Sequence, residues 1–446
     1  MKNFPLSSSR LIPHIIFIIS ISFLLIRNIP LCFLLPIWAH GDEIGHLDYV
    51  LKLSRGHIPQ SYDYIEPSLF LFHKAHWDSR IIASGGEFRV KKIQEMGLAA
   101  YSYEAHHPPL PYFILALCRR LFFLKSQPLL LQISILRLLC LFSVAIGMTV
   151  IYLALRRHNI YDLLFYFPFL FISLLAQDMF AAINTDNFSF FCGAIACAGL
   201  IYIGSDPINP RRWFFLFIGT VLGLWTKISN IYLFTLWAIP LYIYRKSPQR
   251  KSIFSIIFIT LILAFTLSLP WYIYNFIRFS NPIVDPSVQY PLVPPQGFSL
   301  NSLKIFFLAF SRTLFRGEFI WEGHYLDIIH GRFNPLFFGL LPAFIFLVGL
   351  YQLSSKHMLD APISLLFGIL LPPLVFMAYF LIYCFKGGFP LYHARLSFGE
   401  LYFIMLLYVS GWKIILRSTL LAGITAAIML FAYNLIYTIN LVSLIY

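Results

Sequence analysis

The sequence predicts an all-α polytopic membrane protein with about 11 transmembrane helices and an external N-terminal loop that carries amphipathic interfacial helices. Hydrophobic residues make up 59% of the 446 residues, charged residues make up only 12%, and the mean hydropathy is +0.76. Soluble domains carry about a quarter charged residues. The net charge of +14 is spread over short clusters. Such clusters exclude a nucleic-acid-binding protein and suit the cytoplasmic ends of membrane helices.

Apolar runs long enough to span a bilayer define the order of the helices. A span needs about 20 apolar residues, and cytoplasmic flanks carry excess Lys and Arg, so each pass receives a direction. Lys2 and Arg10 place the N-terminus inside. The predicted spans cover about 11–37, 129–155, 161–182, 188–204, two short helices between 212 and 245, 253–275, 333–353, 362–385, 396–412 and 419–443. This alternation predicts one transmembrane domain over 1–446, an external C-terminus, and large external loops at 38–127 and 276–332.

The segment between Arg212 and Arg245 has basic residues at both ends and therefore needs an even number of passes. Two short helices fit, with their apex near Lys227. A lysine at the outer end of a membrane hairpin is expected to have a partner.

The segment from Pro108 to Leu124 is apolar enough to be a span, but counting it would reverse the direction of every later helix. It is therefore expected to lie in the membrane interface. An amphipathic helix there would let Arg119, Arg120 and Lys125 reach lipid headgroups.

The external loop between 38 and 107 holds nine of the 19 acidic residues and seven of the 13 histidines. Because acidic residues and histidines are rare in the rest of the chain, this concentration indicates that the loop carries the functional site. The alternative is simple solvation, because any exposed loop is polar.

Asp42 and Glu43 directly follow the first membrane helix. Glu43, His46 and Val50 recur at helical spacing, so a short helix on the membrane would carry carboxylates on the edge facing its lipid side. A carboxylate there could act as general base on an acceptor hydroxyl. The alternative is a helix cap by Asp42, with Glu43 in the first turn.

The segment "YEAHHPPLPY" presents Glu104, His106 and His107 just before the interfacial helix. Glu and His within a few residues could hold a divalent cation through oxygen and imidazole ligands. The segment lacks a metal spacing such as HExxH, so structural roles stay open.

Isolated cations at predicted external helix ends oppose the usual charge bias. One reason for them is an anionic ligand such as a lipid phosphate, which arginine can bind with two hydrogen bonds. Ordinary loop charge is the alternative, and it is weakest for Lys227 and Arg395, which adjoin apolar helices. The cations are Lys227, Arg278, Arg312, Arg316, Arg332, Lys386 and Arg395.

Taken in order, several motifs resemble the GT-C class of polytopic glycosyltransferases that use polyprenyl-phosphate sugars, which includes protein O-mannosyltransferases and lipid A aminoarabinose transferases. After the first helix come Asp42 and Glu43, then "HPPLPY" and the helix "RLLCLFSVAIGMTVIYLALRR". Farther along lie "INTDNFSFF", "GLWTKISNIYLF", "PWYIYNFIRFSNPI" and "YHARLSFGELYF". Each motif is short, so their collinear order is the stronger signal.

The resemblance implies that Asp42 is the catalytic base, with Glu43 beside it. It also implies further assignments: Lys227, Arg395 and His107 for the donor phosphate, Asp186 for the second acidic site, and Glu104 with His106 for a divalent metal ion.

The function implied is inverting transfer of one sugar from a polyprenyl-phosphate donor to a lipid, glycan or protein acceptor. The expected location is the external face of a bacterial inner membrane, with membrane lipids around the protein and no nucleic-acid partner. The alternative is a non-catalytic flippase or carrier for lipid-linked sugars. Carriers commonly contain internal repeats. The two halves of this chain show none, and the polar groups gather at one face, which favours an enzyme.

Overall fold

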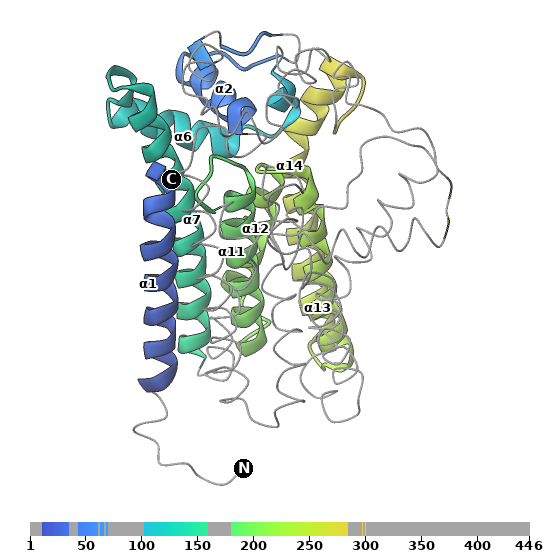
Figure 1. Cartoon of the computed structure of the whole chain (residues 1–446). Coiled ribbons are helices and arrows are strands. Elements are labelled where there is room, and N and C mark those ends of the chain that lie inside the picture. The colour runs from blue at the N-terminus through green and yellow to red at the C-terminus, as the bar shows by residue number, and fades with distance from the viewer. Residues whose placement is uncertain are drawn as a thin grey trace.

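The computed structural model describes residues 11–34, 43–60, 63–66, 68–69, 102–158 and 180–283, together with 297 and 299. This part of the chain is helical and contains no strand. Its helices form a bundle with a layer of short helices at one end (Figure 1). The predicted spans from 333 onward, most of 161–182 and most of the loop 276–332 lie outside the described residues. The total of about 11 spans therefore stays a prediction.

Four of the described helices are long and apolar enough to cross a membrane. They are α1 (Leu11–Leu34), α7 (Leu129–Arg157), α11 (Asp186–Ser205) and α14 (Arg250–Phe279), close to the predicted 11–37, 129–155, 188–204 and 253–275. α7 packs against both α1 and α11. The predicted and observed bounds agree because a backbone in lipid must form all its hydrogen bonds internally, and an α-helix does so. These helices indicate a membrane protein.

The predicted short hairpin lies between α11 and α14. It consists of α12 (Pro210–Leu224), η5 (Ile228–Trp237), α13 (Ala238–Ile243) and η6 (Tyr244–Lys246). Two glycines allow α12 to approach α11 closely. A Cβ atom at Gly199 would lie 2.3 Å from the Leu216 nitrogen, and one at Gly219 would lie 2.6 Å from the Ala196 nitrogen. Any side chain at either position would push the two helices apart.

The layer at one end of the bundle consists of α2 (Glu43–Ser54), η3 (Tyr103–His106), α6 (Leu110–Leu121) and η4 (Leu124–Ser126) (Figure 1). α6 is amphipathic, as its predicted interfacial position requires. Tyr112 and Leu115 are buried in the same core as Leu47 of α2, whereas Leu117 and Leu121 on the other face are exposed. The outer layer is therefore held by its own small hydrophobic core.

Of the two arginines of α6, Arg119 does not have the predicted role at lipid headgroups, whereas for the exposed Arg120 that role stays a prediction. Arg119 is buried, and it donates to Ser54 Oγ at 2.6 Å and to Gln132 Oε1 at 2.9 Å. Arg120 donates through Nε to the Ser54 carbonyl at 2.6 Å. Ser54 is the last residue of α2, where helix carbonyls lack partners and the helix dipole favours cations. Both arginines therefore bind the last residue of α2, and Arg120 and Lys125 remain exposed whereas Arg119 is buried.

The described helices run in the directions that the clusters of basic residues predict, with α7 and α11 both ending at the far end. α1 begins and α7 ends at the end of the bundle away from α2 and α6 (Figure 1). At that far end, Arg157 after α7 and Arg212 at the start of α12 both lie against Tyr202. The described part of the chain thus has one end rich in cations and one end with the outer layer. Which side of a membrane each end faces stays a prediction.

Candidate functional site

Glu43 begins α2 in a fully buried ion pair with Arg137, which lies in the first third of α7. Arg137 Nε and Nη2 bind the two carboxylate oxygens at 2.7 and 2.6 Å, and the two side chains are 0% and 1% exposed. The Ile183 nitrogen donates to the same carboxylate at 3.1 Å, and Arg137 Nη1 contacts the Cys32 carbonyl at 3.4 Å. The predicted orientation of this carboxylate toward the lipid is therefore replaced by an anchor that joins α1, α2, α7 and the start of α11.

Asp42, the predicted base, lies one residue before this anchor and outside the described residues, as does Arg395. Arg137 was not singled out by sequence reasoning. The signal was present, because an arginine inside an apolar span needs a buried partner. The identity of this partner, Glu43, could not be predicted, because Glu43 is far from Arg137 in the sequence.

Lys227 has the partner that its position requires, and the partner is Asp186. Lys227 Nζ lies 2.7 Å from Asp186 Oδ1, and both residues are buried. Asn230 Nδ2 donates to Ser189 Oγ at 2.9 Å beside them, so the apex of the hairpin packs on the first turn of α11. Residues 184–187, which include Asp186 of the predicted second acidic site, are therefore buried against the hairpin.

A second group of titratable side chains lies between α2, η3 and α6. His107 Nε2 lies 2.7 Å from Glu104 Oε2, and His46 Nδ1 lies 3.9 Å from the same oxygen. His46 Nδ1 is also 2.8 Å from the Tyr112 hydroxyl. His107, with His46 from α2, occupies the place beside Glu104 that the sequence predicted for His106.

This donor set bears on the predicted divalent ion. Within the described ranges, no three His, Cys, Asp or Glu side chains converge on one metal position. A zinc site takes three or four protein ligands. The divalent ion at Glu104 and His106 therefore stays a prediction.

The backbone beside Glu104 is held by hydrogen bonds from two other helices. Trp271 Nε1 and Asn275 Nδ2 of α14 both donate to the His106 carbonyl, at 3.2 and 2.8 Å. The Tyr49 hydroxyl of α2 donates to the His107 carbonyl at 3.3 Å. Burial raises the pKa of Tyr49, so this hydroxyl keeps its proton and acts as a donor at neutral pH. Three donors thus hold the backbone at His106 and His107.

The histidine segment and the lysine hairpin are also joined to each other. The Leu110 nitrogen at the start of α6 donates to the Trp225 carbonyl at 3.3 Å, two residues before Lys227. From α14, the Tyr272 hydroxyl donates to the Leu224 carbonyl at 2.7 Å. The outer part of α14 therefore contacts both segments that the sequence predicts to bind the donor phosphate. Sequence reasoning did not single out this role, because only backbone carbonyls are its targets.

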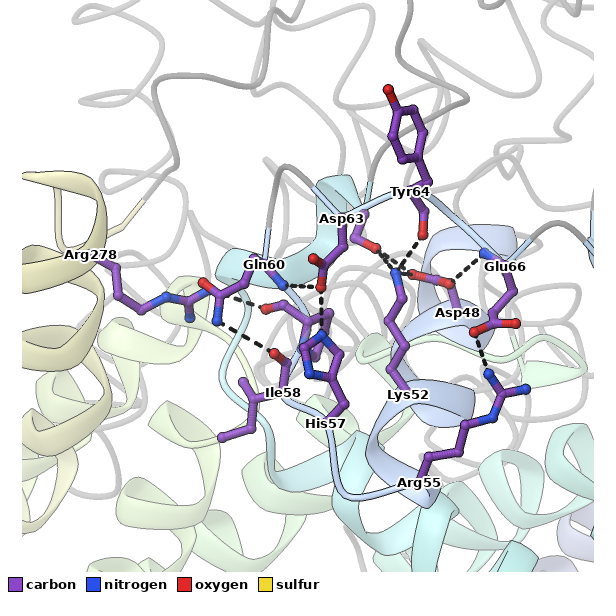
Figure 2. Close-up of polar contacts among 12 residues, drawn as sticks. Asp48, Lys52, Arg55, His57, Ile58, Gln60, Asp63, Tyr64, Glu66 and Arg278 are labelled. Carbon is purple, nitrogen blue, oxygen red and sulfur yellow. Dashed lines mark hydrogen bonds and ion pairs between the residues drawn. The ribbon is translucent and has the colours of Figure 1, made fainter.

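The chain after α2 is fastened by a buried charged network (Figure 2). Lys52 Nζ donates to Asp48 Oδ2 and to the Tyr64 carbonyl, both at 2.8 Å, and it also contacts the Ser102 hydroxyl. Asp48 and Lys52 are four residues apart on α2, a spacing that brings side chains together on a helix. This pair ties the distant residue 102 to α2 and so supports η3.

A second, more exposed network ties the same loop to α14 (Figure 2). Asp63 Oδ2 accepts from the Gln60 nitrogen at 2.8 Å and lies 2.7 Å from His57 Nε2. Burial alone would raise the pKa of Asp63, but the hydrogen bonds from Gln60 and His57 outweigh it and hold this pKa below its usual range. Arg278 Nη2 donates to Gln60 Oε1 at 2.5 Å and to the Pro59 carbonyl at 3.1 Å.

The described candidate residues thus gather at the end of the bundle that carries the outer layer: Glu43, Glu104, His106, His107, Asp186 and Lys227. Comparisons with known proteins add nothing to this picture, since no protein-family model, curated protein or solved structure matches the chain.

Proposed function

We propose that the chain is a membrane glycosyltransferase that moves a sugar from a polyprenyl-phosphate donor to an acceptor hydroxyl or amine. The observation that carries the proposal is the joining of two charged segments at one end of a bundle of membrane-length helices. Lys227 with Asp186 and His107 with Glu104 come from distant parts of the sequence. The bond from Leu110 to Trp225 links them. Cations at the end of a membrane bundle suit a phosphate whose lipid tail stays in the bilayer.

The reaction requires two kinds of group. The acceptor oxygen or nitrogen attacks the anomeric carbon, its proton passes to the Asp42 carboxylate, and the bond from that carbon to the phosphate oxygen breaks with its electron pair. The departing lipid phosphate then gains negative charge, which Lys227, Arg395 and His107 stabilise. Attack from the side opposite the phosphate inverts the anomeric centre.

The Asp186–Lys227 pair gives the phosphate site a defined resting state. An ammonium has three donors, and Asp186 accepts from Lys227 at 2.7 Å. The pairing neutralises a cation that would otherwise be costly at this depth. A phosphate that approaches Lys227 shares it with Asp186, and the ammonium can donate to both.

The test is a transfer assay on the purified chain with a panel of radiolabelled polyprenyl-phosphate sugars and a membrane extract as the acceptor source. Wild type should give labelled product from one donor, and Asp42→Asn should lose about two orders of magnitude in rate, as for a missing general base. Asp206→Asn, the same change at the far end of the bundle, is the matched control and should keep the activity. Movement of intact donor across vesicles without labelled product would instead support the carrier, and full turnover in Asp42→Asn would reject the base.

A further inference from the structure

Two arginines and a histidine surround Tyr202 at the far end of the bundle. Arg157 Cζ and Arg212 Cζ each lie 5.8 Å from the centroid of the Tyr202 ring, and the His158 ring meets it edge-on at 5.3 Å. Arg157 and His158 close α7, Tyr202 belongs to α11, and Arg212 lies in the first turn of α12. Packing of α7, α11 and α12 therefore brings Arg157, His158 and Arg212 to the Tyr202 ring.

Helix dipoles explain only half of this arrangement. The C-terminus of a helix favours cations, which suits Arg156 and Arg157 at the end of α7. The N-terminus disfavours them, yet Arg211 and Arg212 occupy the first turn of α12, which contains no acidic residue. Each cation at this N-terminus is therefore energetically unfavourable. An anion bound between the two helix ends would remove this cost.

Among the residues that the structure describes, no carboxylate forms an ion pair with Arg157, His158 or Arg212. Arg212 Nε and His158 Nε2 are buried from solvent and have no hydrogen-bond partner. Burial, followed by the charges of Arg212 and Arg157, lowers the pKa of His158. The side chains thus repel one another, and buried polar atoms without partners are costly in a native fold.

We propose that Arg157, His158 and Arg212 form a binding site for the phosphate of an anionic lipid headgroup. The helices that could span a membrane end here, at Arg157 and Gly204, so the site lies at the depth of headgroup phosphates. Guanidinium groups bind a phosphate with paired hydrogen bonds. The site is at the opposite end of the bundle from Lys227 and is independent of the proposed sugar transfer.

The test measures lipid binding by native mass spectrometry of the full chain in detergent, with short-chain phosphatidylglycerol, phosphatidylcholine and inorganic phosphate as separate probes. Wild type should bind phosphatidylglycerol in preference to phosphatidylcholine. The double variant Arg157→Gln with Arg212→Gln should lose at least about tenfold in affinity for it. The matched control is Arg156→Gln with Arg211→Gln, which removes the same charge from the neighbouring positions and should lose less than about threefold.

Two results would overturn the proposal. Equal losses in both double variants would show diffuse attraction of lipid to a basic surface, with no site at Tyr202. Displacement of phosphatidylglycerol by low concentrations of inorganic phosphate would identify a site for free phosphate. Thermal unfolding of each variant without lipid shows whether it is folded, and glutamine at these non-core positions is expected to preserve the fold.

Discussion

The buried Glu43–Arg137 pair offers the sharpest test of how this fold is held together. Replacing Arg137 by Met leaves the Glu43 carboxylate at 0% exposure, with only the Ile183 nitrogen left of the three hydrogen bonds described here. Breaking a buried pair by removing one partner costs about 3–5 kcal/mol, because the other charge stays buried without compensation. We expect Arg137→Met and Glu43→Gln each to lose stability on this scale.

The double variant Glu43→Gln with Arg137→Met has a different expected outcome. It buries no charge, and the glutamine oxygen can still accept from the Ile183 nitrogen. Replacing both members of a buried ion pair by residues of similar size is often neutral. We therefore expect the double variant to be more stable than either single variant, so that the two losses do not add.

The assay is denaturant unfolding of the purified chain in detergent micelles, followed by near-ultraviolet circular dichroism. Ser143→Ala is the control, since it removes a neutral buried hydrogen bond from the same helix and should cost less than about 1 kcal/mol. Single-variant losses as small as that of the control, or losses that simply add in the double variant, would refute the buried pair as a unit that holds four segments together.

Three further predictions address the outer end of the bundle. Lys227→Ala should weaken binding of a polyprenyl phosphate by about tenfold or more and Lys227→Arg should partly restore it, measured by tritiated-lipid binding; unchanged affinity in Lys227→Ala and Lys227→Gln would remove this residue from the site. Asn275→Ala should change the pH titration of the histidine rings followed by nuclear magnetic resonance, because it releases the backbone beside Glu104, whereas Ser268→Ala on the same helix should not. The lowered pKa of Asp63 contributes stability above the ordinary value of 3.8, and this contribution is lost as the pH falls through the lowered pKa. The difference in thermal midpoint between wild type and Asp63→Asn should therefore shrink from pH 6 to pH 3, and a constant difference would contradict this.

The sequence by itself determined the class of protein and the order of its described helices. Apolar runs such as 129–155 and 253–275 are local signals, and a bilayer leaves a helix as nearly their only conformation. Basic residues predicted the directions of the described helices, and the run between Arg212 and Arg245 predicted the short hairpin with Lys227 at its apex. Each of these features depends on residues that are close together in the sequence, so it can be predicted from the sequence alone.

Only the tertiary structure decided which charged groups meet. That Lys227 needs a partner follows from its depth, but the choice of Asp186 depends on how the hairpin packs on α11. Arg119 fits a headgroup contact or a helix cap equally well by sequence, and the position of the last turn of α2 decides for the cap. A buried charge is stable only beside a partner with suitable geometry, and partners far apart in the chain are brought together by packing alone.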